Sequence, residues 1–219
     1  MNFPRFQAAA FTLIEVLMGL VVVAILVALF LPRLMHNDPT FRPQCMNNLK
    51  QVGLETLMWA NDHDDKFPWQ ASTTNGGAME LIGTGQASLQ FRPLSEILID
   101  EDGSRLFVCP ADSVKVKGTS VKELHEENVS YFLNADAATN GWPAQTIMAG
   151  DRNLQSDGQP VKPGLFLLTR GMAVSWTAEM HHTGGEVIFM DGHVEWMWAT
   201  NLTGAFMKQP VGTNRVLVP

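Results

Sequence analysis

The distribution of hydrophobic residues divides this chain into two parts. Residues 11–31 are apolar at almost every position, whereas from Arg33 onward apolar and polar residues mix as in a globular domain. As an α-helix, this run of 21 residues would be about 31 Å long, which is enough to cross the hydrocarbon core of a bilayer. We therefore expect a transmembrane helix over residues 11–31, with a globular domain after it.

A second helical pattern follows the apolar run. Between Cys45 and Met58, apolar residues recur three or four positions apart, which is typical of a helix with one buried face. Pro39 and Pro43 disfavour helical geometry before this stretch, and Pro68 ends it. We predict one long helix in two halves, residues 11–31 and 32–66, with a break near residues 36–43.

Residues 67–219 contain short runs that favour β-strands. These runs are rich in β-branched and aromatic residues and are bounded by Gly, Pro and Asn. They span residues 105–110, 128–135, 146–152, 165–168 and 186–198. The fold class predicted from these patterns is α+β, in which the second half of the long helix packs on a small antiparallel sheet.

The last run contains the clearest turn signal. Asp191-Gly192 lies between two strand-like segments and predicts a two-residue hairpin turn, with both residues at positive φ. The closing segment 201–219 is polar and contains Pro and Gly, and we interpret it as a tail that lies on the sheet.

The charge of the chain excludes one class of partner, and its cysteine content leaves two alternatives open. The net charge is −7 at pH 7, and no stripe of basic and aromatic residues is present, so we exclude nucleic acid as a partner. The two cysteines, Cys45 and Cys109, leave two alternatives open. They form a disulfide, which an exported domain would favour, or they are two buried free thiols.

Glu15 is an acidic residue near the start of the apolar run. An ionised carboxylate within a membrane is costly and is expected to have a positively charged partner. Cleavage before Phe11 would create an α-amino group four residues from Glu15. This amine cannot easily reach Glu15 on its own rigid helix, but it can reach Glu15 of a neighbouring copy displaced along the axis. Such head-to-tail contacts build an open helical assembly.

The sequence "AFTLIEVLMGLVVVAILVALFLP" (residues 10–32) resembles the N-terminus of type IV pilins and type II secretion pseudopilins. The resemblance implies that a prepilin peptidase removes a leader, residues 1–10, by cutting between Ala10 and Phe11. The same enzyme then methylates the new amino terminus of Phe11. The family usually has Gly where this chain has Ala10.

The same resemblance assigns further roles. It implies that Glu15 serves filament assembly and that Pro32 bends the helix. It also implies a pilin-like fold and a single-pass inner-membrane precursor with a periplasmic C-terminal domain, which is later incorporated into a pilus or pseudopilus or exposed at the cell surface. The implied partners are the peptidase/methyltransferase, other pilin-like subunits and the membrane.

A second resemblance lies near the C-terminus. The sequence "HHTGGEVIFMDGHVEW" is similar to the signature of a group of prepilin-type proteins in which His181 is followed, nine residues later, by Asp191-Gly192. The internal segments "NNLKQVGLETLMWANDHDDKFP" and "FVCPAD" resemble the same group. This signature identifies the group but implies no chemistry.

Two metal sites were considered from the residue types. His181, His182, His193 and Asp191 are suitable ligands for zinc if they converge, but a turn and a polar strand explain them equally well. Residues 61–66, "NDHDDK", have oxygen ligands at alternate positions, as in calcium loops, but lack the glycine and the distant glutamate. We expect no resident cofactor, with calcium as the one possibility.

The sequence thus supports two functions, neither of them enzymatic. In the first, the chain is a pilin-like subunit that a prepilin peptidase processes and that assembles into a type IV pilus or a type II secretion pseudopilus. In the second, it is a membrane-anchored extracytoplasmic module that binds a glycan or calcium without polymerising. Glu15 distinguishes the two, because only assembly requires it.

Overall fold

The computed structural model describes residues 13–34, 41–99, 101–138, 143–182, 184–209 and 211–219. For residues 28–34, 101 and 102 it describes the backbone alone. The chain forms two compact units, residues 1–40 and residues 41–219.

The first unit contains helix α1, Leu13–Leu34. Leu and Val dominate this segment, and its first proline is Pro32, close to the C-terminal end of the helix. All of its described side chains, residues 13–27, are exposed. Leu13, at 89% exposure, is the most exposed of them.

In the part of the chain that the structure describes, no helix has both the length and the apolar character that crossing a bilayer requires. The prediction of a transmembrane helix over residues 11–31 is therefore wrong, because α1 does not combine the length and the apolar character that a membrane span needs. The same finding contradicts the expected single-pass inner-membrane anchor with its periplasmic domain.

The second unit begins with helix α2, Arg42–Asp62. Pro43 lies in its first turn, where the missing N–H would have no helical partner. Cys45, Leu49 and Val52 are buried, as the spacing predicted. Leu54 and Met58 were expected on the same buried face but are exposed. The helix ends at Asp62 instead of residue 66, and most of the expected break near residues 36–43 lies outside the described residues.

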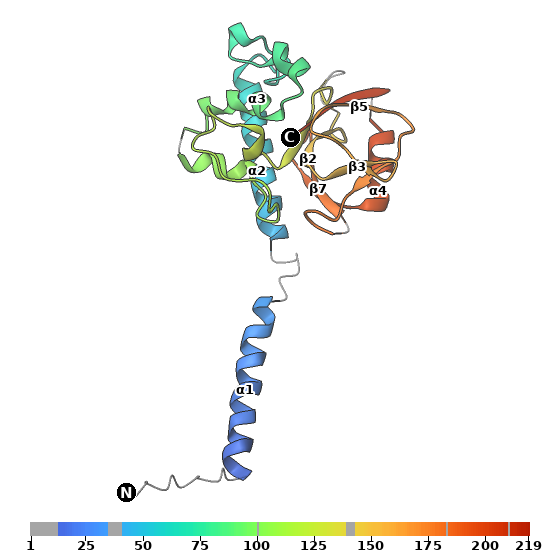
Figure 1. The fold of residues 1–219 in the computed structure, drawn as a ribbon. Coiled ribbons are helices and arrows are strands. Elements are labelled where there is room, and N and C mark those ends of the chain that lie inside the picture. The colour runs from blue at the N-terminus through green and yellow to red at the C-terminus, as the bar shows by residue number, and fades with distance from the viewer. Residues whose placement is uncertain (1–12, 35–40, 100, 139–142, 183, 210) are drawn as a thin grey trace, which may run out of the picture. The chain divides into compact units, whose positions relative to one another are not determined.

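The centre of this unit is a six-stranded antiparallel sheet (Figure 1). The strand order is β5-β9-β1-β2-β7-β8. The strands are β1 Tyr131–Asn134, β2 Ile147–Asp151, β5 Gly164–Thr169, β7 Gly184–Phe189, β8 Val194–Trp198 and β9 Thr213–Val218. A second sheet has the order β4-β3-β6. Its strands are β3 Leu154–Ser156, β4 Gln159–Pro160 and β6 Val174–Trp176.

The three neighbouring strands β1, β2 and β7 of the six-stranded sheet are buried on both faces, whereas the edge strands β5 and β8 are partly exposed. Leu133 and Ile188 point into a hydrophobic cluster with α2 and the helical turns of residues 73–128. Their strand neighbours Phe132 and Val187 belong to a second cluster, with the three-stranded sheet and helix α4, Ala199–Met207. Alternate residues of one strand thus enter two different cores.

Residues 73–128 form short helices instead of strands. They are α3 Ala87–Phe91 and the 3₁₀ helices Thr73–Asn75, Met79–Thr84, Arg92–Glu96, Glu101–Phe107 and Glu126–Asn128. The strand predicted over residues 105–110 is therefore wrong. Val108 uses its carbonyl to accept a hydrogen bond from Asn48 Nδ2 of α2, at 3.1 Å, so this segment is attached to a helix and not to a sheet.

The predicted hairpin exists, but its turn differs. β7 and β8 pair antiparallel, with Ile188 opposite Val194. The N–H of Phe189 donates to the carbonyl of His193, which leaves a three-residue loop, residues 190–192. Only Gly192 has positive φ, at 83°. The loop is thus a turn followed by a glycine bulge, and not a two-residue turn with both residues at positive φ.

The C-terminal segment was interpreted incorrectly as a tail. Residues 199–207 form α4, and β9 lies between β5 and β1 inside the large sheet. β9 alternates exposed and buried residues at Thr213–Val216 and is buried from there to its end. The predicted fold class is therefore wrong. Two separate helices replace the long helix, and a sheet of six strands, with three more beside it, replaces the small sheet.

Helix α2 packs closely against β7 at Gly53. A Cβ atom at Gly53 would overlap Ile188 Cδ1 and would lie 3.2 Å from Met148 Cε. Alanine is more favourable than glycine inside a helix by about 1 kcal/mol. The overlap with Ile188 acts against this gain, because overpacking a core costs about 1–3 kcal/mol. We expect Gly53→Ala to lower the free energy of unfolding by about 1–2 kcal/mol, measured by urea denaturation.

Gly204 of α4 provides the matched control, because a Cβ atom there would have no atom within 4 Å. We expect Gly204→Ala to stabilise the chain by up to about 1 kcal/mol. Ile188→Val removes the overlapping methyl group, so the double mutant should recover part of the loss beyond additivity. Strictly additive effects of Gly53→Ala and Ile188→Val would contradict the proposed overlap.

Candidate functional site: a buried cluster at the disulfide

Cys45 and Cys109 form a disulfide, which decides between the two alternatives that the sequence left open. Cys45 lies in the first turn of α2, and Cys109 follows the 3₁₀ helix Glu101–Phe107. Both side chains are fully buried. The bond therefore attaches α2 to the loop "FVCPAD", next to the hydrogen bond between Asn48 and Val108.

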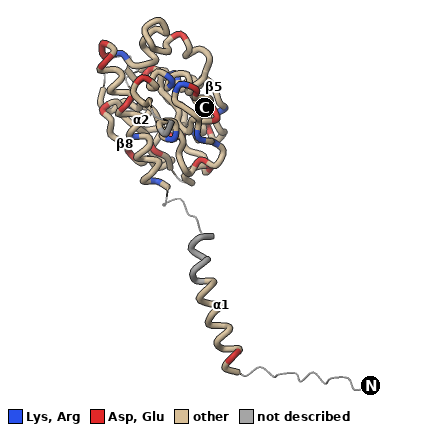
Figure 2. The backbone as a smooth tube through the Cα atoms, turned by 90° about the vertical axis from the view of Figure 1, so that its left-hand side faces the viewer, with Lys and Arg blue, Asp and Glu red and all other residues tan. Residues whose placement is uncertain are grey.

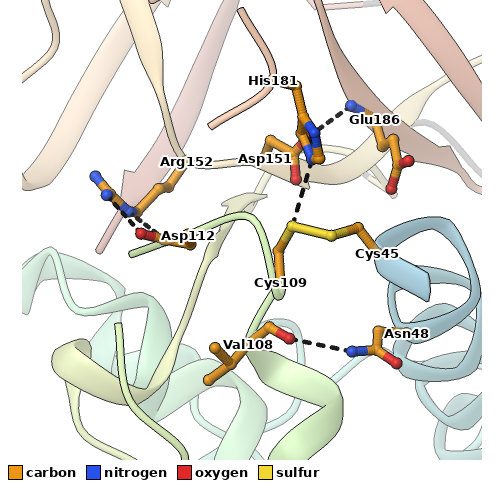
Figure 3. Close-up of a disulfide and its surroundings, with 9 residues drawn as sticks. All are labelled: Cys45, Asn48, Val108, Cys109, Asp112, Asp151, Arg152, His181 and Glu186. Carbon is orange, nitrogen blue, oxygen red and sulfur yellow. Dashed lines mark hydrogen bonds and ion pairs between the residues drawn. A yellow bond between two sulfur atoms is a disulfide. The ribbon is translucent and has the colours of Figure 1, made fainter. Parts of the chain in front are cut away.

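His181 lies against this disulfide (Figure 3). It precedes β7, is 2% exposed, and places Nε2 3.3 Å from Cys109 Sγ. The same nitrogen is 3.6 Å from Asp151 Oδ2. The ring also meets the edge of Trp196 at a centroid distance of 5.6 Å. His181 is thus a core residue that contacts both sulfur and a carboxylate.

Two buried carboxylates complete the cluster. Asp151 ends β2 and Glu186 lies in the neighbouring strand β7, and both side chains are fully buried. Asp151 Oδ2 accepts a hydrogen bond from the backbone N–H of Glu186, at 2.8 Å. Among the described residues, Asp151 Oδ1 and both carboxylate oxygens of Glu186 have no hydrogen-bond partner.

Burial raises the pKa values of both acids, because it disfavours the charged carboxylate. The pKa of Asp151 rises to about 7, and the nearby charge of Asp112 contributes to the rise. The pKa of Glu186 rises to about 9, with the charge of Asp151 adding to burial and Arg42 opposing both. The two carboxylates therefore favour states in which they do not both carry a charge.

Two arginine side chains lie near the cluster, one in ion pairs and one over an aromatic ring. Arg152, next to Asp151, donates two hydrogen bonds to the buried carboxylate of Asp112, at 2.7 and 2.9 Å. It also contacts Glu179. Arg42 of α2 lies over the ring of Trp196, with its Cζ 3.4 Å from the ring centroid. These pairs hold the cations close to the cluster.

The structure separates the two ends of the His181…Asp191-Gly192 signature. β7 lies between them, and its six residues span about 20 Å at the usual rise per residue. Asp191 instead pairs with His193 in the hairpin loop. A Cβ atom at Gly192 would lie 3.2 Å from Leu57, so the loop packs on α2 and requires a glycine there. The Asp-Gly part of the signature is structural.

The zinc site considered from the sequence is not formed by its residues. His182 and His193 are exposed, whereas His181 is buried. In the described residues, one group of three or more His, Cys, Asp or Glu side chains brings its ligand atoms together, and it consists of Cys45, Cys109 and His181. Residues 61–66, considered for calcium, form no such group.

The residues expected to act in processing and assembly lie in or before α1. Ala10 and Phe11, with the whole leader 1–10, are outside the described residues. Glu15 lies in the first turn of α1, and its side chain is exposed. Figure 2 shows acidic colouring near the start of the α1 tube. Pro32 lies within α1, and the structure describes its backbone alone.

Sequence reasoning identified His181 and both cysteines but missed Asp151 and Glu186. The only signal was an acidic residue within each of two strongly apolar strands, "IMAGD" and "GGEVIF". Their proximity follows from the pairing of β2 with β7, in which Gly150 is opposite Val187. No property of either segment alone indicates this pairing.

Comparison with known proteins gave no relative: no family model, no curated protein and no solved structure matches this chain.

The disulfide joins residues separated by 64 positions, and a loop of that length corresponds to about 4 kcal/mol in the chain-entropy model. We expect Cys45→Ala/Cys109→Ala to lower the free energy of unfolding by about 2–4 kcal/mol, measured by urea denaturation. The same double mutant should lose its response to a reductant. A loss below about 1 kcal/mol would show that the bond adds little to stability.

The raised pKa of Glu186 makes the stability of the folded chain, with its disulfide intact, depend on pH. Its ordinary pKa is 4.5 and its folded pKa is about 9. Between these values the folded chain holds a proton that the unfolded chain has released, so the free energy of unfolding falls as pH rises. Asp151 acts in the same direction up to about pH 7, and Arg42 opposes the effect.

As pH rises from about 5 to about 9, we expect the free energy of unfolding to fall less for Glu186→Gln than for the wild type. Urea denaturation across this range measures the difference. Glu195→Gln is the control, because Glu195 is exposed on the adjacent strand β8. Parallel pH profiles of the wild type and Glu186→Gln would show that Glu186 retains no proton in the folded chain.

Proposed function

We propose that this chain is a pilin-like filament subunit whose α1 helices pack against those of neighbouring copies. The observation that carries the proposal is the surface of α1. Glu15 is its only charged residue before Arg33, and apart from its acidic start the described tube of α1 has the colour of uncharged residues in Figure 2. The described side chains around Glu15 are exposed and almost all apolar.

An exposed apolar helix of this kind requires a partner. Large apolar side chains from Leu13 to Val27 are exposed by 47–89%. Burying one such side chain contributes about 1.5–3 kcal/mol, and contiguous apolar patches of this extent mark interaction sites. Identical helices packed side by side would bury the surface on every side, because no face of α1 is polar.

Glu15 gives this packing a register. If a prepilin peptidase cuts before Phe11, the new α-amino group carries a positive charge next to the apolar surface. Glu15 of a neighbouring copy then provides the matching carboxylate. The contact joins different surfaces of the two copies, so the assembly stays open and grows as a filament. The resemblance of residues 10–32 to pilins supports this arrangement.

The proposal implies two kinds of protein partner. The first is a prepilin peptidase that removes residues 1–10 and methylates Phe11. The second is another pilin-like subunit, either a copy of this chain or a related one. The chain is then a substrate of the peptidase and a structural component, and not a catalyst.

Co-expression of the full chain with a prepilin peptidase tests the proposal. Intact mass and N-terminal sequencing should show a methylated Phe11 only when the peptidase is present. Removing one partner of a buried ion pair costs about 3–5 kcal/mol. We therefore expect Glu15→Ala to be processed normally but to reduce the sedimentable filament fraction by at least about a hundredfold.

Glu127→Ala is the matched control, because Glu127 is an exposed glutamate in the second unit. It should assemble as the wild type does, in sedimentation and in negative-stain electron microscopy. Filaments formed equally well by Glu15→Ala would rule out the proposed register. A chain that retains Met1 with the peptidase present would rule out processing at Ala10.

A further inference from the structure

Three metal-ligand side chains converge where α2, the "FVCPAD" loop and the segment before β7 meet. The ligand atoms of Cys45, Cys109 and His181 all lie within 4.8 Å of one another. All three side chains are buried, with at most 2% exposure. They come from positions far apart in the chain, so the fold and not the local sequence brings them together (Figure 3).

Two distances from His181 Nε2 are close to those between ligands of one zinc ion, whereas the two sulfur atoms, which are bonded in this structure, have to move apart after reduction. With Zn–S near 2.3 Å and Zn–N near 2.05 Å, a tetrahedral site separates sulfur from nitrogen by about 3.6 Å. His181 Nε2 is 3.3 Å from Cys109 Sγ. A nitrogen and a carboxylate oxygen in such a site are about 3.4 Å apart, and His181 Nε2 is 3.6 Å from Asp151 Oδ2.

We propose that the chain, once the Cys45–Cys109 disulfide is reduced, binds one Zn²⁺ through Cys45, Cys109 and His181, with Asp151 as the fourth ligand. Two thiolates, an imidazole and a carboxylate are ligands that zinc prefers. The cluster then has two alternative forms, a disulfide and a zinc site. This inference rests on the buried cluster and is independent of the filament proposal.

The surroundings of Asp151 support its place in the site. Its Oδ2 accepts the backbone N–H of Glu186, which is the kind of outer hydrogen bond that orients a metal-bound carboxylate. Its Oδ1 has no hydrogen-bond partner among the described residues although the side chain is fully buried. A bound cation would supply the positive charge that stabilises the ionised carboxylate.

The conversion is balanced as follows. A dithiol reductant gives two electrons and two protons, the bond between the two sulfur atoms breaks, and the dithiol becomes a disulfide. The two cysteines are then thiols. Zn²⁺ displaces both thiol protons into solvent as the two Zn–S bonds form. A small-molecule disulfide reverses the conversion: it accepts two electrons from the two thiolates and two protons from solvent to become a dithiol, the bond between Cys45 and Cys109 forms, and Zn²⁺ leaves. The redox state therefore selects which form is present.

The test uses the full-length chain and zinc alone. One sample is reduced with a phosphine, which supplies the same two electrons and becomes a phosphine oxide, and the other is left oxidised. After incubation with Zn²⁺ and gel filtration, mass spectrometry of the metal should find about one zinc per reduced chain and none in the oxidised chain. Co²⁺ in place of Zn²⁺ should give a thiolate-to-cobalt charge-transfer band only after reduction.

His181→Asn and His182→Asn form a matched pair. His182 is exposed and has φ of 52°, a conformation that asparagine tolerates. We expect His181→Asn to weaken zinc affinity by at least about a hundredfold, and His182→Asn to leave it unchanged. Asp151→Asn should weaken the affinity and alter the Co²⁺ spectrum, because it changes the fourth ligand.

Circular dichroism and thermal unfolding separate binding from misfolding. If the reduced chain is folded, zinc should raise its melting temperature. If the reduced chain is unfolded without metal, zinc should restore the native spectrum. A reduced chain that gains neither zinc nor stability would overturn the proposal. Equal zinc affinity of the wild type and His181→Asn would also overturn it.

Discussion

Strand β7 is the constraint on which the second unit depends. All six of its residues are buried, and it pairs with β2 on one side and β8 on the other. Ile188 belongs to the cluster formed with α2, and Val187 belongs to the cluster formed with the three-stranded sheet and α4. Because both cores share this strand, a change in its register would exchange the two sets of side chains.

The same strand explains why the candidate site is chemically unusual. Glu186 is the only ionisable residue of β7, and its position between two cores leaves its carboxylate without solvent. Asp151, at the end of β2, is held beside it by sheet pairing, and His181 enters from the segment that leads into β7. A buried disulfide next to two acids and an imidazole is therefore a result of strand order.

The two units favour different kinds of chemistry. In α1 the described surface is apolar and exposed, with a single carboxylate, and it is suited to association with similar helices. In the second unit the reactive groups are buried, and the Cys45–Cys109 bond fixes α2 against the loop that carries Cys109. The proposed association and the proposed redox chemistry therefore concern separate parts of the chain, and each can be tested without the other.

The sequence by itself determined local features. It located α2 by its apolar spacing, the β7–β8 hairpin by Asp191-Gly192, and three strands of the large sheet, because these depend on residues close in the chain. Only the tertiary structure decided that β9 is a strand of the large sheet and that residues 105–110 are not. It also decided that Asp191-Gly192 lies far from His181, at the other end of β7. It likewise decided that His181 contacts Cys109 and Asp151, because pairing between distant segments has no signature within either segment.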